Sequence, residues 1–194
     1  MSLRRHAAWI APALFALAML LAATGVPEYS HRQHPVALRG TAGLSHAALF
    51  NALAFVLPGM LLAWAGQGLR VALQSAGWLA RIGIVLVQLS ALAFAMQGLL
   101  PINPQDMDSP ASRLHALAWM LWWIAFVPGV LLLALGARGG PWFTLACVAA
   151  GVLVPLIAVF APIGLWVGLA QRLAFGLWFG WWLVATSLAK PRAE

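Results

Sequence analysis

Six long runs of apolar residues constrain this chain more than any other feature of its sequence. They lie near residues 7–26, 46–66, 77–100, 115–136, 142–161 and 170–189. An α-helix needs about 20 apolar residues to cross a bilayer, and the short connections leave no room for a soluble domain. Only 8% of the residues are charged, against roughly 25% in soluble domains. We therefore predict an all-α integral membrane protein with about six transmembrane helices, forming one transmembrane domain over residues 1–194.

The first run also resembles a signal peptide, because a basic start at Arg4 and Arg5 precedes it. However, the apolar run from Ala7 to Val26 is long enough to span a bilayer, and no clean cleavage motif precedes Glu28. We expect a retained first helix.

The distribution of Lys and Arg predicts the orientation. With the N-terminus in the cytoplasm, seven of the 11 basic residues fall inside, and four fall outside: Arg32, Arg39, Arg113 and Arg172. Such a bias is typical of helical membrane proteins. We expect both termini in the cytoplasm and a multi-pass protein of the bacterial inner membrane. Basic residues scattered singly among apolar runs argue against nucleic acid as a partner.

Two of the runs are similar to each other. His46 opens HAALFNALAFVLPGMLLA, and His115 opens HALAWMLWWIAFVPGVLLLA, and both contain a Pro-Gly pair. This similarity favours a parallel repeat of helix pairs, with chance likeness between apolar helices as the alternative.

Polar side chains concentrate on the outer side of this topology. They include four of the 5 histidines and three of the 4 acids: His31, His34, His46, His115, Glu28, Asp106 and Asp108. The asymmetry indicates a polar site, unless the two longest connections are polar simply because they are loops. The second, fourth and sixth helices would begin there, and the unpaired N–H groups at their starts favour an anion.

Six residues near these helix starts are candidate ligands for an anionic headgroup: Arg172, Arg113, Arg39, His46, Ser45 and Trp119. Two aromatic stripes lie below them, and these would suit an acyl or isoprenoid chain: Trp119, Trp122, Trp123 and Phe126, and also Phe175 and Phe179. The alternative is ordinary helix packing, with Ser45 and Ser112 as helix caps and arginines that reach lipid headgroups.

Acid/base chemistry would fall to His115, assisted by Asp106 or Asp108, since a histidine beside a carboxylate is a common general base. These three residues are the catalytic candidates. Ser112 precedes His115 but lacks the sequence context of a nucleophile. Whether the protein is an enzyme stays open.

A metal site is a lesser alternative. Glu28, His31 and His34 offer suitable ligand atoms, but the chain contains no established metal-binding motif. We therefore predict no metal and no cofactor.

Four short motifs also recur in a known family: Tyr29-Ser30 with Arg32, Phe50-Asn51, a Leu-Pro loop before His115, and Gly168-x-x-Gln171-Arg172. Through them, nearly the whole chain resembles the bacterial membrane proteins grouped as domain-of-unknown-function family 998. Members commonly carry an acid shortly after the proline of the middle loop, where this chain has Asn103. The resemblance implies a six-helix inner-membrane fold and leaves the activity open. It also draws attention to His115 and Arg172.

We expect an outer-facing site that binds, and in one version processes, an anionic lipid or a similar amphiphile, with membrane lipids as partners. The alternative is a non-catalytic subunit or assembly factor of a larger membrane complex, with a membrane-protein partner. The small size of the chain and its 11 Trp residues favour that alternative.

Overall fold

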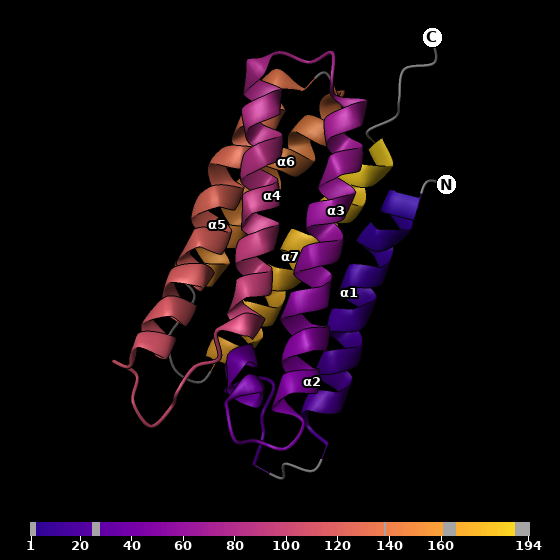
Figure 1. The fold of residues 1–194 in the computed structure, drawn as a ribbon. Helices are drawn as coiled ribbons and strands as arrows, with labels where there is room; N and C mark the ends of the chain where they lie inside the picture. The colour runs from indigo at the N-terminus through magenta and orange to yellow at the C-terminus, as the bar shows by residue number, and fades with distance from the viewer. Residues whose placement is uncertain (1–2, 25–27, 138, 161–165, 189–194) are drawn as a thin grey trace.

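The computed structural model describes residues 3–24, 28–137, 139–160 and 166–188 (Figure 1). These residues form six long helical segments and no strand. The second segment is continuous and consists of α2 (Ala47–Asn51), a π-helical segment (Ala52–Val56) and α3 (Leu57–Ala72). The others are α1 (Leu3–Ala22), α4 (Trp78–Leu99), α5 (Pro110–Gly136), α6 (Pro141–Phe160) and α7 (Val167–Leu188). A short 3-10 helix, Val36–Gly40, lies in the first connection.

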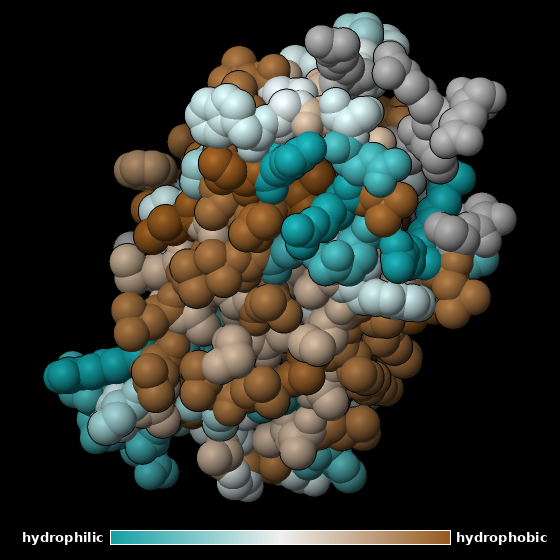
Figure 2. All heavy atoms as spheres, turned by 45° about the horizontal axis from the view of Figure 1, so that its top comes forward, coloured by the Kyte–Doolittle hydropathy of each residue, from teal (hydrophilic) through white to brown (hydrophobic). Residues whose placement is uncertain are grey.

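Within the described ranges, five of these segments are long and apolar enough to cross a membrane. The sixth, α7, has 22 residues and packs against α1, α3 and α6. Figure 2 shows a broad apolar belt between hydrophilic regions of the surface. The prediction of an all-α integral membrane protein is confirmed, whereas a membrane crossing by α7 itself stays a prediction.

The two ends of the bundle differ in what they carry. Leu3 and Leu188, the first and last described residues, lie at one end, which we call the terminal end (Figure 1). The long connections before α2 and before α5 lie at the opposite end, which we call the loop end (Figure 1). The charged residues that the sequence predicts on the outer side therefore share one end of the bundle.

The largest error at a predicted helix start is five residues, which is more than one turn. We expected a helix from residue 115, but α5 begins at Pro110. Ser109 caps it, because its Oγ accepts a hydrogen bond from the Ser112 backbone N–H, and Pro110 suits the first helical position. Ser112 is therefore not the cap, and His115 lies in the second turn rather than at the helix start.

The helices pack closely where glycines remove side chains. A Cβ on Gly59 would lie 2.6 Å from the Ala91 carbonyl oxygen of α4, and one on Gly129 would lie 2.8 Å from Val87 of the same helix. Gly59 and Gly129 belong to the two Pro-Gly pairs of the similar runs. The Pro-Gly pairs of the two similar runs therefore share a packing role, because α3 and α5 each approach α4 closely at the glycine of the pair. The parallel repeat itself stays a prediction.

The π-helical segment explains how the second span accommodates its proline. Pro58 has no N–H and its ring crowds the preceding turn, and a wider π turn relieves both problems. Just before it, Asn51 is buried and its Nδ2 donates to the Gly40 carbonyl oxygen at 2.8 Å. Gly40 must be glycine, because a Cβ there would lie 1.8 Å from Asn51 Oδ1. This contact fastens the first connection to the second span.

The two aromatic stripes meet in the centre of the bundle. Trp122 and Phe175 are fully buried, with ring centroids 4.9 Å apart, and Phe94 of α4 lies 5.0 Å from Phe175. Phe15 of α1 closes the cluster against Phe179 at 5.2 Å. Trp122 and Phe126 of the first stripe and both residues of the second are therefore core residues, as the packing interpretation predicts, whereas Trp119 and Trp123 are only partly buried.

Candidate functional site

Arg172 joins the first connection to α7 at the loop end. Its Nη1 donates to the carbonyl oxygens of Gly168 at 2.7 Å and His34 at 3.0 Å, and its Nη2 donates to the Tyr29 hydroxyl. Tyr29 and His34 precede α7 by more than half of the chain. A single guanidinium thus connects segments that only tertiary folding brings together.

Neighbouring contacts hold the same junction. The Leu169 N–H donates to the Arg32 carbonyl oxygen at 3.1 Å, and the Val36 N–H donates to Gln171 Oε1 at 3.0 Å. The first of these bonds satisfies one of the unpaired N–H groups at the start of α7. The start of α7 is therefore partly occupied by protein atoms, and less of it is available to an anion than the sequence led us to expect.

The side chains and backbone around Gly168 are tightly packed. A Cβ on Gly168 would lie 2.4 Å from the His34 carbonyl oxygen and 2.7 Å from that of His31. The Arg32 guanidinium stacks over the Trp166 ring, 3.4 Å from its centroid. Glycine is required at position 168 because the loop backbone lies directly against the helix.

Arg172 has no carboxylate partner among the described residues. Its side chain is only partly exposed, and its Nε is buried without a hydrogen bond, as is Nε of Arg39. Burial raises the pKa of Tyr29 above its ordinary value of 10.0. The charges of Arg172 and Arg39 and the hydrogen bond from Arg172 lower it by less, so Tyr29 stays neutral at pH 7. In the described part of the chain, the structure shows one ion pair, between Arg113 and Asp108. The positive charge around Tyr29 is therefore uncompensated.

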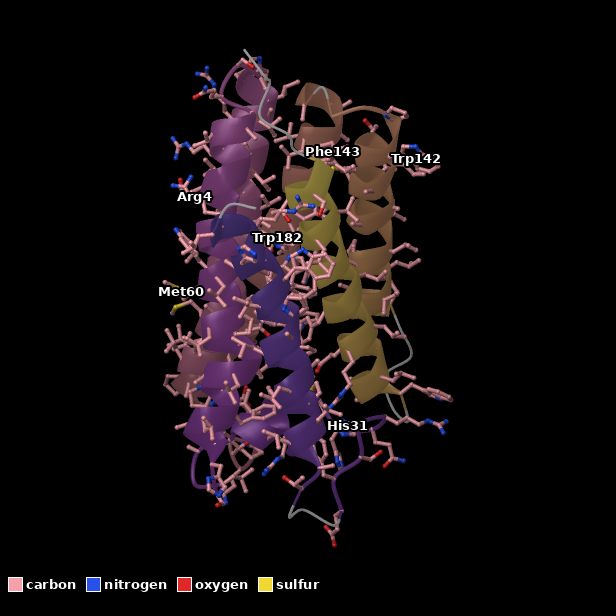
Figure 3. All side chains as sticks on the ribbon, turned by 90° about the vertical axis from the view of Figure 1, so that its right-hand side faces the viewer. Arg4, His31, Met60, Trp142, Phe143 and Trp182 are labelled. Carbon is pink, nitrogen blue, oxygen red and sulfur yellow. The ribbon has the colours of Figure 1, made fainter. Side chains whose placement is uncertain are left out.

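Two histidines surround the same tyrosine and add no negative charge. His31 packs edge-on against the Tyr29 ring at 5.1 Å and lies at the loop end (Figure 3). Burial, and then the charge of Arg172, lower the pKa of His31 from its ordinary value of 6.5. His34 Nδ1 accepts a hydrogen bond from the Ser30 N–H at 3.0 Å, so in this arrangement that nitrogen carries no proton. We call Tyr29, His31, His34, Arg39 and Arg172 the Arg172 cluster.

Below Arg172, α7 presents an open surface. Gly176 and Gly180 follow at i+4 and i+8, which places them on the same helical face. A Cβ at either position would meet nothing within 4 Å. Gly176 and Gly180 form a strip of bare backbone on the surface of α7, which we call the glycine trough. It runs along the helix from the level of Arg172 toward the mid-height of the bundle.

His115 has a clear structural role. It is buried, and its Nδ1 lies 3.1 Å from the Gln97 carbonyl oxygen and 2.8 Å from that of Leu100. Carbonyl oxygens only accept, so Nδ1 carries a proton and donates to both. The ring thereby satisfies carbonyls at the end of α4 that have no partner within their own helix.

The proposed acid partners of His115 lie on the surface. Asp106 and Asp108 are exposed, and an Asp108 carboxylate oxygen lies 3.7 Å from the Arg113 guanidinium. Ser112 Oγ lies within 3.2 Å of the Asn103 and Asp106 carbonyl oxygens. No hydrogen bond or ion pair in the described residues joins either aspartate side chain to His115. Catalysis by His115 and the aspartates stays a prediction without geometric support.

The other predicted ligands are dispersed over the loop end. Ser45 and His46 are exposed at the start of α2, where His46, rather than Ser45, occupies the cap position, with φ 61°. Trp119 is half-buried, and its indole Nε1 is buried without a partner. Of the six candidate ligands, only Arg172 and Arg39 both lie close enough to the Tyr29 hydroxyl for their charges to lower its pKa. The roles of the other four stay predictions.

Within the described ranges, no three His, Cys, Asp or Glu side chains are grouped closely enough to hold a metal ion. Glu28 is exposed next to Tyr29, and Glu28, His31 and His34 form no such group.

Sequence reasoning did not identify Tyr29 or Gln171 as site residues. The available signal was the resemblance, because Tyr29, Arg32, Gly168, Gln171 and Arg172 are the motif residues at the two distant ends of the chain. In the structure, all five contribute to the junction between the first connection and α7.

Comparisons with known proteins identify the family of the chain. The model of one family, described as Protein of unknown function (DUF998), matches residues 9–188, which include the Arg172 cluster and all six long helical segments nearly in full. No curated protein and no solved structure matches the chain. With almost its whole length covered by the family model, this chain belongs to the DUF998 family.

Proposed function

We propose that the protein binds an anionic amphiphile at the loop end, with the negative headgroup at the Arg172 cluster and an apolar chain along the glycine trough. The observation that carries this proposal is the uncompensated charge of Arg172 and Arg39, each of which has a buried Nε without a partner. A charge withdrawn from water is costly unless it is paired. An anionic headgroup would supply the missing negative charge.

The trough supports an amphiphile over a free anion. Gly176 and Gly180 leave open space on the face that continues from Arg172 into the apolar part of α7. An acyl chain that lay there would be held against the backbone while its headgroup stayed at the end of the bundle. Acid/base processing of the bound molecule is not part of this proposal, because His115 donates to the α4 carbonyls and forms no hydrogen bond with Arg172 or Tyr29 in the described structure.

The test compares lipid retention in two variants and one control. Arg39→Gln removes a charge that makes no side-chain hydrogen bond in the described structure, and Gly176→Leu fills the trough on an exposed face. Arg113→Gln is the matched control, because it removes an exposed arginine at the same end that already pairs with Asp108. Native mass spectrometry of the purified chain with added phosphatidylglycerol, oleate or inorganic phosphate measures binding.

We expect phosphatidylglycerol or oleate to be retained by the native chain and by Arg113→Gln. Arg39→Gln should weaken retention about fivefold, which corresponds to roughly 1 kcal/mol for one arginine near an anionic group. Gly176→Leu should weaken binding of the amphiphiles only. Binding of phosphate with no preference for an amphiphile would refute the role of the trough, and equal losses in Arg39→Gln and Arg113→Gln would refute a specific cluster.

His31 provides an independent readout. A bound anion would offset the charge of Arg172 and so raise the lowered pKa of His31. By linkage, the amphiphile should then bind more tightly as the pH falls through the pKa of His31. An NMR titration of labelled histidine, assigned with His31→Gln, should show this pKa rise when oleate is added. An unchanged titration would show that the ligand binds elsewhere.

We further propose that the protein lies in a bacterial inner membrane with the loop end outside. Four described arginines lie at the terminal end, Arg4, Arg5, Arg70 and Arg81, and the sequence adds three more basic residues that lie outside the described residues: Arg138, Lys190 and Arg192. Labelling of Ser45→Cys in a Cys147→Ala background with an impermeant maleimide on whole cells tests this orientation. Labelling only after lysis would reverse it.

The alternative role, a non-catalytic subunit of a larger complex, makes a different prediction in the same mass spectra. A stoichiometric protein partner that is retained without lipid would support it, and would make the Arg172 cluster a purely structural junction.

A further inference from the structure

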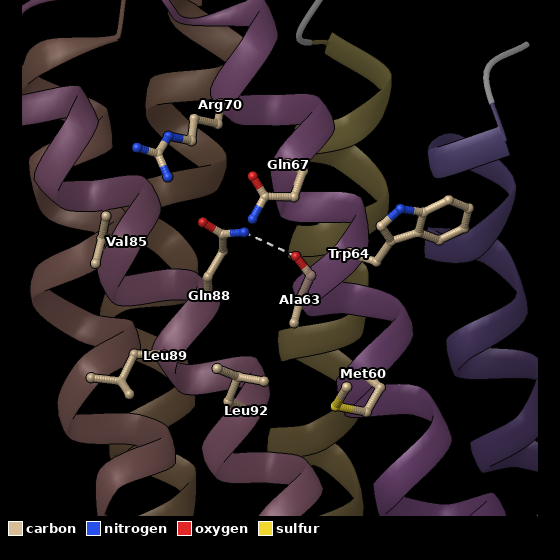
Figure 4. Close-up of a pocket in the computed structure, with 9 residues that line it drawn as sticks. All are labelled: Met60, Ala63, Trp64, Gln67, Arg70, Val85, Gln88, Leu89 and Leu92. Carbon is tan, nitrogen blue, oxygen red and sulfur yellow. Dashed lines mark hydrogen bonds between the residues drawn. The ribbon is translucent and has the colours of Figure 1, made fainter.

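A groove on the membrane-facing side of α3 and α4 lies in the half of the bundle toward the terminal end (Figure 4). Its volume is about 560 Å³, within the range of roughly 300–1,000 Å³ that small-molecule sites occupy. Met60 and Trp64 of α3 are exposed along it, and Met60 projects away from the bundle (Figure 3). Leu89 and Leu92 form its α4 wall. The groove therefore opens sideways toward the bilayer.

Polar groups line one half of this groove. Gln88 Nε2 donates to the Ala63 carbonyl oxygen at 2.9 Å. A Cβ on Gly66 would lie 2.6 Å from Gln88 Cγ, so the Gln88 side chain packs directly against the Gly66 backbone. Gln67 and Arg70 are exposed above it and form no hydrogen bond or ion pair between side chains in the described structure (Figure 4). The second N–H of Gln88 Nε2, the Gln67 amide and the Arg70 guanidinium thus leave donors available to whatever fills the groove.

Tryptophans give the depth of these groups in the membrane. Gly68 packs beside Arg4, since a Cβ on Gly68 would lie 3.5 Å from Arg4 Cβ. Trp64 and Trp9 lie four and five residues deeper on their antiparallel helices, and both are exposed, at 41% and 51%. Tryptophans are typical of the boundary between headgroups and hydrocarbon, and Trp78 and Trp142, which are more exposed, at 69% and 74%, lie at the starts of α4 and α6. The Ala63 carbonyl and Gln88 therefore lie on the hydrocarbon side of this boundary.

This depth orders the groove along the bilayer normal. Gln88 bonds to Ala63 ten residues below the start of α4, and Arg70 lies seven residues farther out than Ala63, which is about 10 Å along the helix. Leu92 lies four residues deeper than Gln88, which is about 6 Å. A cation outermost, amides below it and aliphatic side chains deepest match the order of phosphate, ester groups and acyl chain in a phospholipid.

The charge at this end also selects an anionic occupant. Glu28, Asp106 and Asp108 are the acids of the described residues, and all three belong to the loop-end connections. No described acid at the terminal end therefore competes for Arg70. A second membrane helix would need its own acidic side chain at headgroup depth, whereas a phospholipid brings its phosphate to that depth in any bilayer.

We propose that the groove binds one anionic glycerophospholipid from the leaflet at the terminal end. Its phosphate lies at Arg70, and its ester oxygens accept hydrogen bonds at Gln67 and Gln88. One acyl chain lies along Met60 and Leu92. The site is separate from the Arg172 cluster at the opposite end of the bundle, and it does not depend on the function proposed there.

Retention of defined lipids by the full chain tests the proposal. The purified protein in neutral detergent receives palmitoyl-oleoyl-phosphatidylglycerol or the matching phosphatidylcholine, and native mass spectrometry counts the bound molecules. Arg70→Gln removes the phosphate partner, and Leu92→Trp fills the apolar half from an exposed position. Two matched controls lie outside the groove: Arg81→Gln, an exposed arginine at the same end, and Leu99→Trp, an exposed leucine of the same helix.

We expect Arg70→Gln to lower phosphatidylglycerol retention about fivefold without a change in phosphatidylcholine retention. Leu92→Trp should lower retention of both lipids, and the two controls should behave as the native chain does. Equal losses in Arg70→Gln and Arg81→Gln would show diffuse surface attraction and overturn the proposal. Native-like lipid retention in both groove variants would also overturn it. So would a native dimer that Leu92→Trp dissociates, since that outcome assigns the groove to a second copy of the chain.

The two lipid proposals fail independently in this assay. Arg39→Gln affects only the loop-end site, and Arg70→Gln only the groove. The double variant should therefore lose both bound lipids, whereas each single variant should keep the other.

Discussion

Replacement of His115 separates a structural role from a catalytic one. Its Nδ1–H donates to the Gln97 and Leu100 carbonyl oxygens at 3.1 and 2.8 Å, in a buried setting at the end of α4. His115→Ala removes both hydrogen bonds, leaves two carbonyls without donors and opens a cavity. Net losses of about 0.5–1.5 kcal/mol per bond, together with the lost ring packing, give about 2–4 kcal/mol of destabilisation.

The position of the donor sharpens this prediction. An asparagine amide nitrogen lies close to the position of histidine Nδ1, whereas a glutamine amide lies nearer to Nε2. His115→Asn should therefore recover most of the lost stability, and His115→Gln should recover little. Neither replacement can act as a general base at neutral pH, so the pair also distinguishes a cap from a catalyst.

Thermal unfolding in neutral detergent, followed by tryptophan fluorescence, measures the effect. The apparent Tm of His115→Ala should fall on the order of 10 °C, while His6→Ala, an exposed histidine of α1, should leave it unchanged. Equal Tm values for native chain and His115→Ala would refute the capping role. Full stability of His115→Asn with complete loss of a measured activity would restore His115 to the catalytic candidates.

Three further predictions test the packing and the charge of the bundle. Gly83→Ala would place a Cβ 2.8 Å from a backbone oxygen of α5 and should lower the Tm, whereas Gly180→Ala meets nothing within 4 Å and should not. Asn51→Leu leaves the carbonyl oxygen that it binds at 2.8 Å without a donor, and should cost about 1–3 kcal/mol in detergent unfolding. His31 has a lowered pKa in the folded chain, so below pH 6.5 the unfolded chain binds more protons than the folded chain. The free energy of unfolding should therefore be highest above pH 6.5 and should fall as the pH drops toward the pKa of the folded chain. This acid loss should shrink in His31→Gln, and an unchanged pH profile would contradict the assigned environment.

The helical architecture could be predicted from the sequence because it depends on local properties. Run length, low charge and breaker residues indicated an all-α membrane protein, and the six long segments follow those runs. The largest error at a helix start, at α5, came from reading apolarity alone. Ser109 and Pro110 start that helix through capping, a polar signal that lies outside the apolar run.

The candidate site could be predicted only in part. Arg172 and Arg39 were identified because arginine beside an apolar run is a visible exception in composition. His115 and Asp106 were grouped because they are close in sequence, yet the Nδ1 of His115 faces backbone carbonyls of α4. Closeness in sequence does not give the direction in which a side chain points, because a helix turns 100° per residue and nearby residues point to different neighbours.

The sequence by itself determined where the helices are, which end carries the polar connections and that the chain belongs in a membrane. Only the tertiary structure decided that Arg172 meets Tyr29, 143 residues away, and that Gln88 bonds to the Ala63 carbonyl at the edge of a groove. Burial of apolar length in lipid is a sum over local residues, so it can be read along the chain. The partner of a charged or amide side chain depends on which helix faces pack together, and that is settled by the close fit of glycines and aromatic rings across the whole bundle.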